Sequence, residues 1–505
     1  MTSPVRRKSV RCVAWGLAAL WVVHSVAAER VVLEPALADP ASAEFPAPAV
    51  IEPVAANVIP VNAPDPAPEA GAVELSQHRR SGVVSAWLSN GVRVHVRAIQ
   101  SPPPGQIYVT VSLFGGELLE DNATRGLSRL TVAALDDALS PDTAPPDVKR
   151  QLGLRDVHFD GIPAPDAIMF RIWGVPDDVM VGARLAGRAL STLSPDDASL
   201  ARCRHELQQP KVDKMFGVAG QCVEDLVSPR PHRPRAVAEE DLRCFKSDDV
   251  RSWLAAHTRP GGACIEVSVV GDVLLDQALN IAREVVGRLP ERSRVCAASL
   301  AAMRRLPPPV GPFNGAVTAD LGGDHRPIVV AGFLGIDSSK PAQVRTLRVA
   351  GRVLQARVRA RMEQAGLTHL PDDCGAGVWF SSDPGYSRLI MLARVDVDRS
   401  DQASIILNDE VDRLSINGPT AAELRSATDV LAEEVRKYNA DPRWWSGFLG
   451  RCTALGVDPD EVYTGVEFYR SLTAEGVLDT VHDLWNPQSR IGLIIKPRNP
   501  EPAAP

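Results

Sequence analysis

The sequence lacks the short motifs on which most metal and redox sites depend. It has eight cysteines among 505 residues but no C-x-x-C pair, which argues against a zinc knuckle and a thioredoxin-like site. Its ten histidines are scattered, and no two lie within five residues of each other. No helix can therefore offer two histidines to one zinc ion, and only a cluster assembled from distant parts of the chain stays open.

Signatures of other enzymes and of nucleic-acid binding are missing as well. The sequence contains no G-x-S-x-G elbow, no P-loop and no G-x-G-x-x-G motif. The net charge of −7 is mild, and no basic stripe predicts nucleic-acid binding. After the N-terminal segment, no apolar run reaches the roughly 20 residues of a transmembrane helix. With 45% hydrophobic residues, the chain can instead form two or three globular domains.

The N-terminal segment predicts export. Basic residues at positions 6–8 precede the apolar run CVAWGLAALWVVHSVAA, which ends in small residues that suit a cleavage site. We expect residues 1–28 to be the signal peptide of a periplasmic or extracellular protein, with an uncleaved membrane anchor as the alternative. Residues 29–75 are rich in Pro and Ala and predict an extended linker. Export would permit disulfides among the other seven cysteines, but their pairing cannot be read from the sequence.

The strongest pattern in the sequence is an internal duplication. Blocks of the first half recur in the same order in the second half, at offsets of about 220–226 residues. The paired blocks are FKSDDVRSWLAAHTRP with SLTAEGVLDTVHDLWNP, LSPDDASLARCRHEL with NGPTAAELRSATDVL, and QIYVTVSLFGG with RPIVVAGFLG. Strand and helix patterns are mixed in each half, and Ser247 is the expected N-cap of the Phe245–His257 helix. We predict an α+β fold of two homologous domains, residues 76–306 and 307–505, each a mixed or antiparallel sheet with helices packed on it.

These blocks, together with LSNGVRVHV and VTVSLFGGELLEDNATRGLSRL, resemble the pitrilysin/insulinase family of zinc metallopeptidases, the inverzincins. The resemblance extends over Ala86–Pro497, nearly the whole chain after the linker. It implies a metallopeptidase fold in which two-domain halves commonly enclose a chamber, either fused in one chain or as separate subunits.

The resemblance also locates the family's metal helix. The family pattern G-L-x-H-x-x-E-H supplies two zinc-binding histidines and a general-base glutamate. Here the segment reads GLSRLTVA, with Arg129 and Ala133 at the histidine positions and Val132 at the glutamate position. Glu206, 73 residues after Ala133, stands about where the third zinc ligand belongs. Glu206 is then a remnant ligand, a partner of Arg129, or a solvated carboxylate on a helix.

A second family motif is degenerate too. An Arg and a Tyr of the second domain hold the substrate in the pattern L-R-E-x-x-G-L-x-Y, and the corresponding stretch here is ARMEQAGLTHL. Met362 stands at the arginine position and His369 at the tyrosine position, while Arg361 is one residue out of register. The resemblance thus implies neither a working zinc site nor a complete substrate clamp.

These residues favour a non-catalytic homologue of the peptidases. We expect a structural or regulatory subunit that forms a chamber with an active zinc peptidase, in a homo- or hetero-oligomer, and we expect no bound zinc or other cofactor. Two alternatives stay open: a divergent zinc metallopeptidase whose ligands are unrecognised, and an exported module that binds a peptide without cleaving it.

Overall fold

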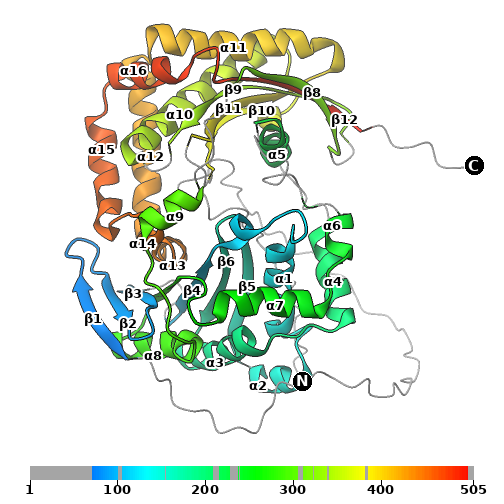
Figure 1. Cartoon of the computed structure of the whole chain (residues 1–505). Coiled ribbons are helices and arrows are strands. Elements are labelled where there is room, and N and C mark those ends of the chain that lie inside the picture. The colour runs from blue at the N-terminus through cyan, green and yellow to red at the C-terminus, as the bar shows by residue number, and fades with distance from the viewer. Residues whose placement is uncertain are drawn as a thin grey trace, which may run out of the picture.

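The computed structural model shows two halves, each a sheet covered by helices, stacked one above the other (Figure 1). It describes residues 71–100, 105–153, 155–208, 215–227, 237, 239–304, 311–321, 324–337, 340–381 and 385–498. The predicted signal peptide and most of the predicted linker lie outside these residues. None of the helices in the described ranges is both long enough and apolar enough to cross a membrane.

The first half contains a seven-stranded sheet with the order β1-β2-β3-β7-β4-β6-β5. Its central strands β4 and β7 are buried along their whole length, as expected of runs rich in Val and Ile. The strands are β1 (Ala72–Gln77), β2 (Val84–Leu88), β3 (Arg93–Ala98), β4 (Ile107–Phe114), β5 (Val157–Ala164), β6 (Ala167–Gly174) and β7 (Ile265–Gly271).

The second half repeats five of these strands in the same spatial order. Its sheet runs β10-β11-β9-β12-β8, which corresponds to β5-β6-β4-β7-β3 of the first sheet. The pairs β3–β7 and β8–β12 are parallel, and the other strand pairs in the described part of the chain are antiparallel. The strands are β8 (Phe313–Ala319), β9 (Ile328–Ile336), β10 (Cys374–Trp379), β11 (Ser387–Arg394) and β12 (Arg490–Pro497). The predicted fold class, two similar α+β domains, is confirmed.

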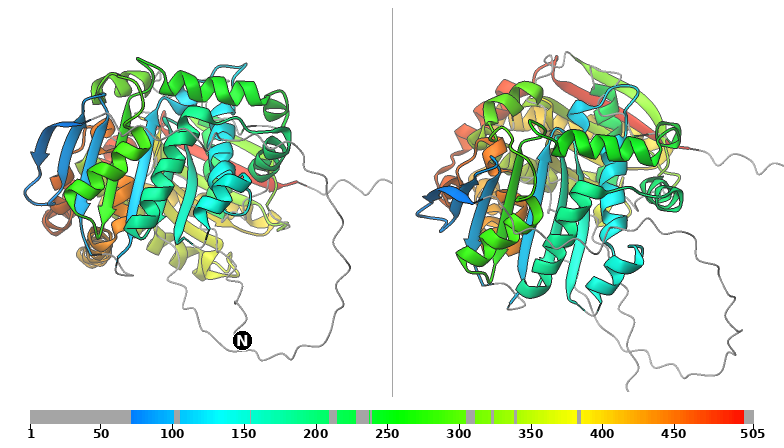
Figure 2. Two further views of the ribbon diagram at one scale, coloured as in Figure 1. Left: turned by 90° about the horizontal axis from the view of Figure 1, so that it is seen from below. Right: turned by 60° about the horizontal axis from the view of Figure 1, so that its bottom comes forward.

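Helices pack on both sheets, most of them on the outer face. In the first half they are α1 (Leu127–Leu139), α2 (Pro146–Leu152), α3 (Pro176–Thr192), α4 (Asp197–Gln208), α5 (Met215–Val227), α6 (Glu239–Arg243), α7 (Ser247–Thr258), α8 (Leu275–Val286) and α9 (Ala297–Arg304). In the second they are α10 (Pro341–Gln364), α11 (Ser400–Asn417), α12 (Ala421–Ala440), α13 (Pro442–Leu449), α14 (Cys452–Leu455), α15 (Gly465–Ser471) and α16 (Ala474–Leu484). Figure 2 shows the helices of the first half lying over one face of its sheet.

Two local expectations differ from the structure. The N-cap of α7 is Lys246 rather than Ser247, because the side chain of Asp249 turns back to accept the backbone N–H of Lys246 at 2.7 Å. Strand β1 begins at Ala72, inside the stretch predicted as linker. The border predicted between residues 306 and 307 lies outside the described residues, so the domain limits stay a prediction.

Each half lends a helix to the inner face of the other half's sheet. Helix α5 lies against the second sheet, where Met215, Ala219 and Val223 pack with apolar residues of β9, β11 and β12 (Figure 1). Helix α13 lies against the first sheet, where the hydroxyl groups of Ser446 and Thr110 are 2.8 Å apart. Since each sheet is covered partly by the other half, neither half buries its own core completely.

The contact of α5 with the second sheet predicts an unusual response to a glycine substitution. Gly220 lies against the ring of Trp379, and a Cβ added at Gly220 would fall 2.4 Å from a ring carbon. Gly→Ala inside a helix normally stabilises by about 0.5–1 kcal/mol. We expect Gly220→Ala instead to destabilise the protein by about 1–3 kcal/mol, because the added methyl forces α5 away from β10. Differential scanning calorimetry measures the change.

The matched control is Gly351→Ala, inside α10. There an added Cβ meets its nearest atom at 3.6 Å, which is ordinary van der Waals contact. Gly351→Ala should therefore be neutral or stabilising. If Gly220→Ala stabilises the chain as much as Gly351→Ala does, the packing of α5 on the second sheet is wrong.

Candidate functional site

The segment aligned with the family's metal helix is indeed a helix. Helix α1 follows Gly126, whose φ of 84° lies in the left-handed region that glycine adopts most easily. The carboxylate of Glu120 accepts the backbone N–H groups of Gly126 and Ser128 at 2.9 and 2.7 Å, which satisfies donors at the start of the helix. Leu127, Leu130 and other apolar residues of α1 are buried in the core of the first half. The helix is therefore built to the family's pattern except at the ligand positions.

Arg129 places a positive charge where the resemblance puts the first zinc ligand. Its Nε donates to the carboxylate of Glu117 at 2.7 Å, and both side chains are largely buried. The adjacent Glu117 carboxylate raises the pKa of Arg129 above its ordinary value. The guanidinium group has no lone pair for a metal and repels a divalent cation.

The other two positions offer no ligand atom. Val132 is only 3% exposed and packs on β5, where a Cβ at Gly161 would lie 2.7 Å from its Cγ1. Ala133 is half-buried against the core of the first half. A valine packed on the sheet cannot act as a general base, and an alanine methyl cannot bind zinc.

Glu206 lies on α4, which packs on α1. The carboxylate of Asp137, near the end of α1, accepts a hydrogen bond from Nε of Arg202, in the middle of α4, at 2.9 Å. Ala133 lies one turn before Asp137, and Glu206 lies one turn after Arg202. The backbone carbonyl of Leu242 accepts Nε of Arg204 of α4 at 3.1 Å, and Leu242 lies beside Gly126 at the start of α1, so the two helices run antiparallel. Glu206 then lies near the level of Ala133, and its side chain is exposed.

The zinc site that the fold implies does not fit these residues. A catalytic zinc needs three protein ligands and a water molecule, and Glu206 is the only ligand-type residue at the positions that the family uses. The predicted site residues therefore lie on two packed helices, α1 and α4, but they do not provide a set of zinc ligands. No catalytic step can be derived through zinc at α1.

The predicted substrate-clamp positions lie apart from each other. Met362 is fully buried in the core of the second half, on α10. His369 lies after α10, where its exposed ring contacts the carboxylate of Asp396 at 3.4 Å. A buried thioether and a surface imidazole do not form a joint site for a substrate carbonyl.

A cluster that the sequence analysis missed lies between the two halves. His95 of β3, Glu266 of β7 and Cys452 of α14 are all fully buried, and His95 Nε2 lies 2.8 Å from Glu266 and 3.4 Å from Cys452. Their types suit a metal, but Glu266 is already bonded by His95 and by the backbone N–H groups of Thr453 and Ala454 at 2.8 and 3.2 Å. The sequence feature that could have indicated this cluster is a polar residue inside each of two apolar strands, His95 in β3 and Glu266 in β7.

This cluster does not have the geometry of a thiol nucleophile. In such a site, one nitrogen of the histidine faces the thiol and the other faces the orienting acid. Here Cys452 and Glu266 both face Nε2, while Nδ1 of His95 contacts Ser85 Oγ at 2.7 Å. Burial and the nearby Glu266 raise the pKa of the Cys452 thiol well above its ordinary value. We interpret the cluster as a polar link between the halves.

A second buried link joins the halves through Asp166, in the turn between β5 and β6. Its carboxylate is fully buried and pairs with Arg304 of α9 at 2.6 Å and with Arg451, between α13 and α14. Burial opposes the ionised form, but the two guanidinium groups outweigh it and lower the pKa of Asp166. Removing one member would leave buried charge unpaired, which typically costs about 3–5 kcal/mol.

Comparison with known proteins supports the resemblance. Residues 245–431 match the family model described as the peptidase M16 inactive domain. That range runs from α7 of the first half into α12 of the second. Comparison with curated proteins gives no match. The resemblance to pitrilysin-type peptidases predicted from the sequence is confirmed.

Solved structures share the fold at low sequence identity. A peptidase M16 inactive domain from Pseudomonas fluorescens has a TM-score of 0.66 at 17% identity, over 83% of this chain and 98% of that chain. The periplasmic protease PqqL from Escherichia coli has a TM-score of 0.67 at 14% identity, over 89% of this chain and 49% of that chain. Pitrilysin has a TM-score of 0.61 at 14% identity, over 86% of this chain and 47% of that chain. The present chain thus spans about half the length of PqqL and pitrilysin.

Burial of His95 predicts a loss of stability in mild acid. Burial outweighs the neighbouring Glu266 and lowers the pKa of His95, so the folded protein keeps this ring neutral. Below the unfolded pKa of about 6.5, the unfolded chain takes up a proton that the folded chain refuses. The stability is therefore complete above about pH 6.5 and falls as the pH drops through that value, as calorimetry in steps from pH 8 to pH 5 would show.

His95→Gln should remove part of this pH dependence. His257 should supply another part, because burial lowers its pKa as well. Equal slopes for wild type and His95→Gln would contradict the buried link.

Proposed function

We propose that this protein is a non-catalytic homologue of the pitrilysin-type peptidases that acts as a structural or regulatory subunit of a peptidase chamber. The observation that carries the proposal is α1, a well-formed helix that has Arg129, Val132 and Ala133 where zinc ligands and a general base would stand. The fold around it is kept, with both sheets, their matching topology and the buried links between the halves. A chain that has this fold without the metal ligands suits a structural role in a peptidase chamber.

The extent of the structural match supports a partner. The two domains match about half of PqqL and of pitrilysin, so they correspond to one half of such an enzyme. We propose that an active subunit with an intact H-x-x-E-H helix supplies the other half. PqqL is described as periplasmic, which agrees with the signal peptide that we infer at residues 1–28.

Restoring the missing histidines tests whether α1 stands at the position of the family's zinc site. Arg129→His with Ala133→His places two imidazoles one turn apart on α1, level with Glu206 on α4. We leave Val132 unchanged, because a glutamate there would be buried on β5. The double variant should bind one more zinc ion per chain than wild type. Its zinc affinity should be about 10–100-fold lower than that of a complete zinc site, because the outer-shell partners of the ligands are missing. Metal analysis by mass spectrometry and titration against a chelating dye measure both quantities.

Adding Glu206→Gln to the double variant provides the control. Zinc binding should weaken, since a neutral amide replaces the third ligand. If the folded double variant gains no zinc, or if the gain does not depend on Glu206, the alignment of α1 and α4 with the metal site is wrong.

The proposed partnership predicts a complex in native material. Protein isolated from its own cells should elute above the monomer mass and carry a second polypeptide that contains H-x-x-E-H. That complex should hydrolyse peptides in a zinc-dependent manner, while this chain alone should not. Light scattering coupled to size exclusion, followed by peptide sequencing, checks this. A strict monomer without a co-purifying peptidase would favour the isolated peptide-binding module instead.

A further inference from the structure

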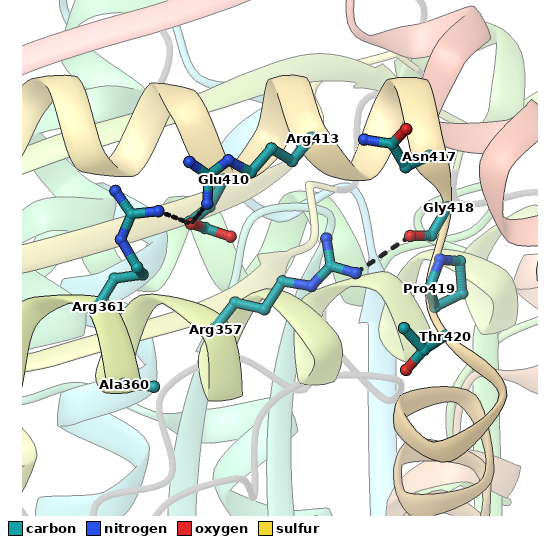
Figure 3. Close-up of a pocket in the computed structure, with 9 residues that line it drawn as sticks. All are labelled: Arg357, Ala360, Arg361, Glu410, Arg413, Asn417, Gly418, Pro419 and Thr420. Atoms are coloured by element: carbon teal, nitrogen blue, oxygen red, sulfur yellow. Dashed lines mark hydrogen bonds and ion pairs between the residues drawn. The ribbon is translucent and has the colours of Figure 1, made fainter. Parts of the chain in front are cut away.

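A pocket lined by arginine side chains opens on the outer helical layer of the second half, away from α1 (Figure 3). It has a volume of about 460 Å³ and lies between α10, α11 and the connection from α11 to α12. The lining residues are Arg357, Ala360, Arg361, Glu410, Arg413, Asn417, Gly418, Pro419 and Thr420. Ala360 and Gly418 have little or no side chain, which leaves the space open.

The pocket carries an excess of positive charge. Arg357 pairs with Glu423 through two hydrogen bonds, of 2.7 and 2.8 Å. That contact lowers the pKa of Glu423 to about 2, so the pair stays ionised over the whole physiological range. Arg361 and Arg413 share a single carboxylate, that of Glu410. Three guanidinium groups thus face two carboxylates.

Glu410 orients the two remaining arginines rather than neutralising them. Its side chain is only 4% exposed, and its Oε1 accepts Nη1 of Arg361 and Nη1 of Arg413, each at 3.2 Å. A guanidinium has five N–H donors, so most donors of both residues are left for a ligand. Arg361 is 31% exposed and Arg413 is 52% exposed, and Figure 3 shows both side chains beside Glu410 at one end of the pocket.

The opposite end of the pocket carries less positive charge, because the carboxylate of Glu423 lies there and accepts hydrogen bonds from the backbone N–H and Oγ1 of Thr420 at 2.7 and 2.9 Å. Asn417 offers a side-chain amide, and Thr420 is the N-cap of the 20-residue helix α12. Figure 3 shows Arg357 between this end and the Arg361–Arg413 end. The pocket therefore offers a row of donors with the strongest positive charge at one end, which suits an extended ligand better than a compact one. It has no aromatic side chain in its lining, so stacking of a nucleobase is not provided for.

An ion-pair network that only joins α10 and α11 is the simpler account of these residues. Such a network would need one carboxylate for each guanidinium to compensate the charge. Here the carboxylate at the centre is buried and shared, whereas the guanidinium groups are turned outward. Arginine pairs with carboxylates in a planar, two-bond geometry, as Arg357 already does with Glu423.

We propose that this pocket binds an acidic side chain of an extended peptide, with a carboxylate held between Arg361 and Arg413. The peptide would continue past Arg357 towards Asn417. This inference is independent of the proposed loss of zinc, because the pocket lies on a different helical layer from α1. Through this pocket, the chain would bind acidic polypeptide segments outside the proposed peptidase chamber.

Fluorescence anisotropy with labelled hexaglutamate tests the proposal. Wild type should bind one peptide per chain, and binding should weaken as salt rises from about 50 to 200 mM. The variant Arg361→Ala/Arg413→Ala should bind at least about tenfold more weakly. Glu410→Gln should bind more tightly, because it removes the competing carboxylate and leaves both arginines in place. An increase on one change and a loss on another cannot both result from unfolding.

The control removes the same charge elsewhere. Arg436→Ala/Arg470→Ala changes two exposed arginines of α12 and α15, and its affinity should stay within about twofold of wild type. Equal affinities of the two double variants, or no saturable binding by wild type, would overturn the proposal. If inorganic phosphate displaces hexaglutamate at equal concentration, the pocket takes phosphate and the assignment to a peptide carboxylate is wrong.

Discussion

The exchange of helices between the two halves is the constraint on which the rest of the structure depends. Helix α5 closes the inner face of the second sheet, and α13 closes that of the first. Buried charge holds this arrangement in register, with Asp166 between Arg304 and Arg451. Because an unpaired buried charge is costly, the halves cannot slide past each other without a large loss of stability. Helix α1 itself is held within the first half, where it packs on β5, β6, α3, α4 and α7.

Loss of the metal ligands is compatible with this fold because the fold uses other residues of α1. Leu127 and Leu130 are buried in the core of the first half, whereas Arg129 points towards Glu117. In the Arg129–Glu117 ion pair, each group compensates the charge of the other. Val132 packs on β5 as an ordinary core residue. The helix that would carry the chemistry thus contributes packing and the ion pairs of Arg129 and Asp137.

Much of the fold could be predicted from the sequence, since it depends on local patterns that occur twice. The paired blocks predict the two α+β domains that the structure shows. The helix exchange could not be predicted, because nothing local says which sheet α5 or α13 will cover. The same holds for His95, Glu266 and Cys452, which lie up to 357 residues apart and meet only when the halves pack. The roles assigned to the site residues stay predictions.

We propose that this chain has no peptidase activity of its own. The most direct measurement is hydrolysis of an unfolded polypeptide by the purified wild-type protein with added zinc, compared with the Glu206→Gln variant and with a chelator. We expect no cleavage above the buffer control in any of these samples. Zinc-dependent cleavage that co-elutes with the protein, stops with chelator and is lost in Glu206→Gln would contradict it.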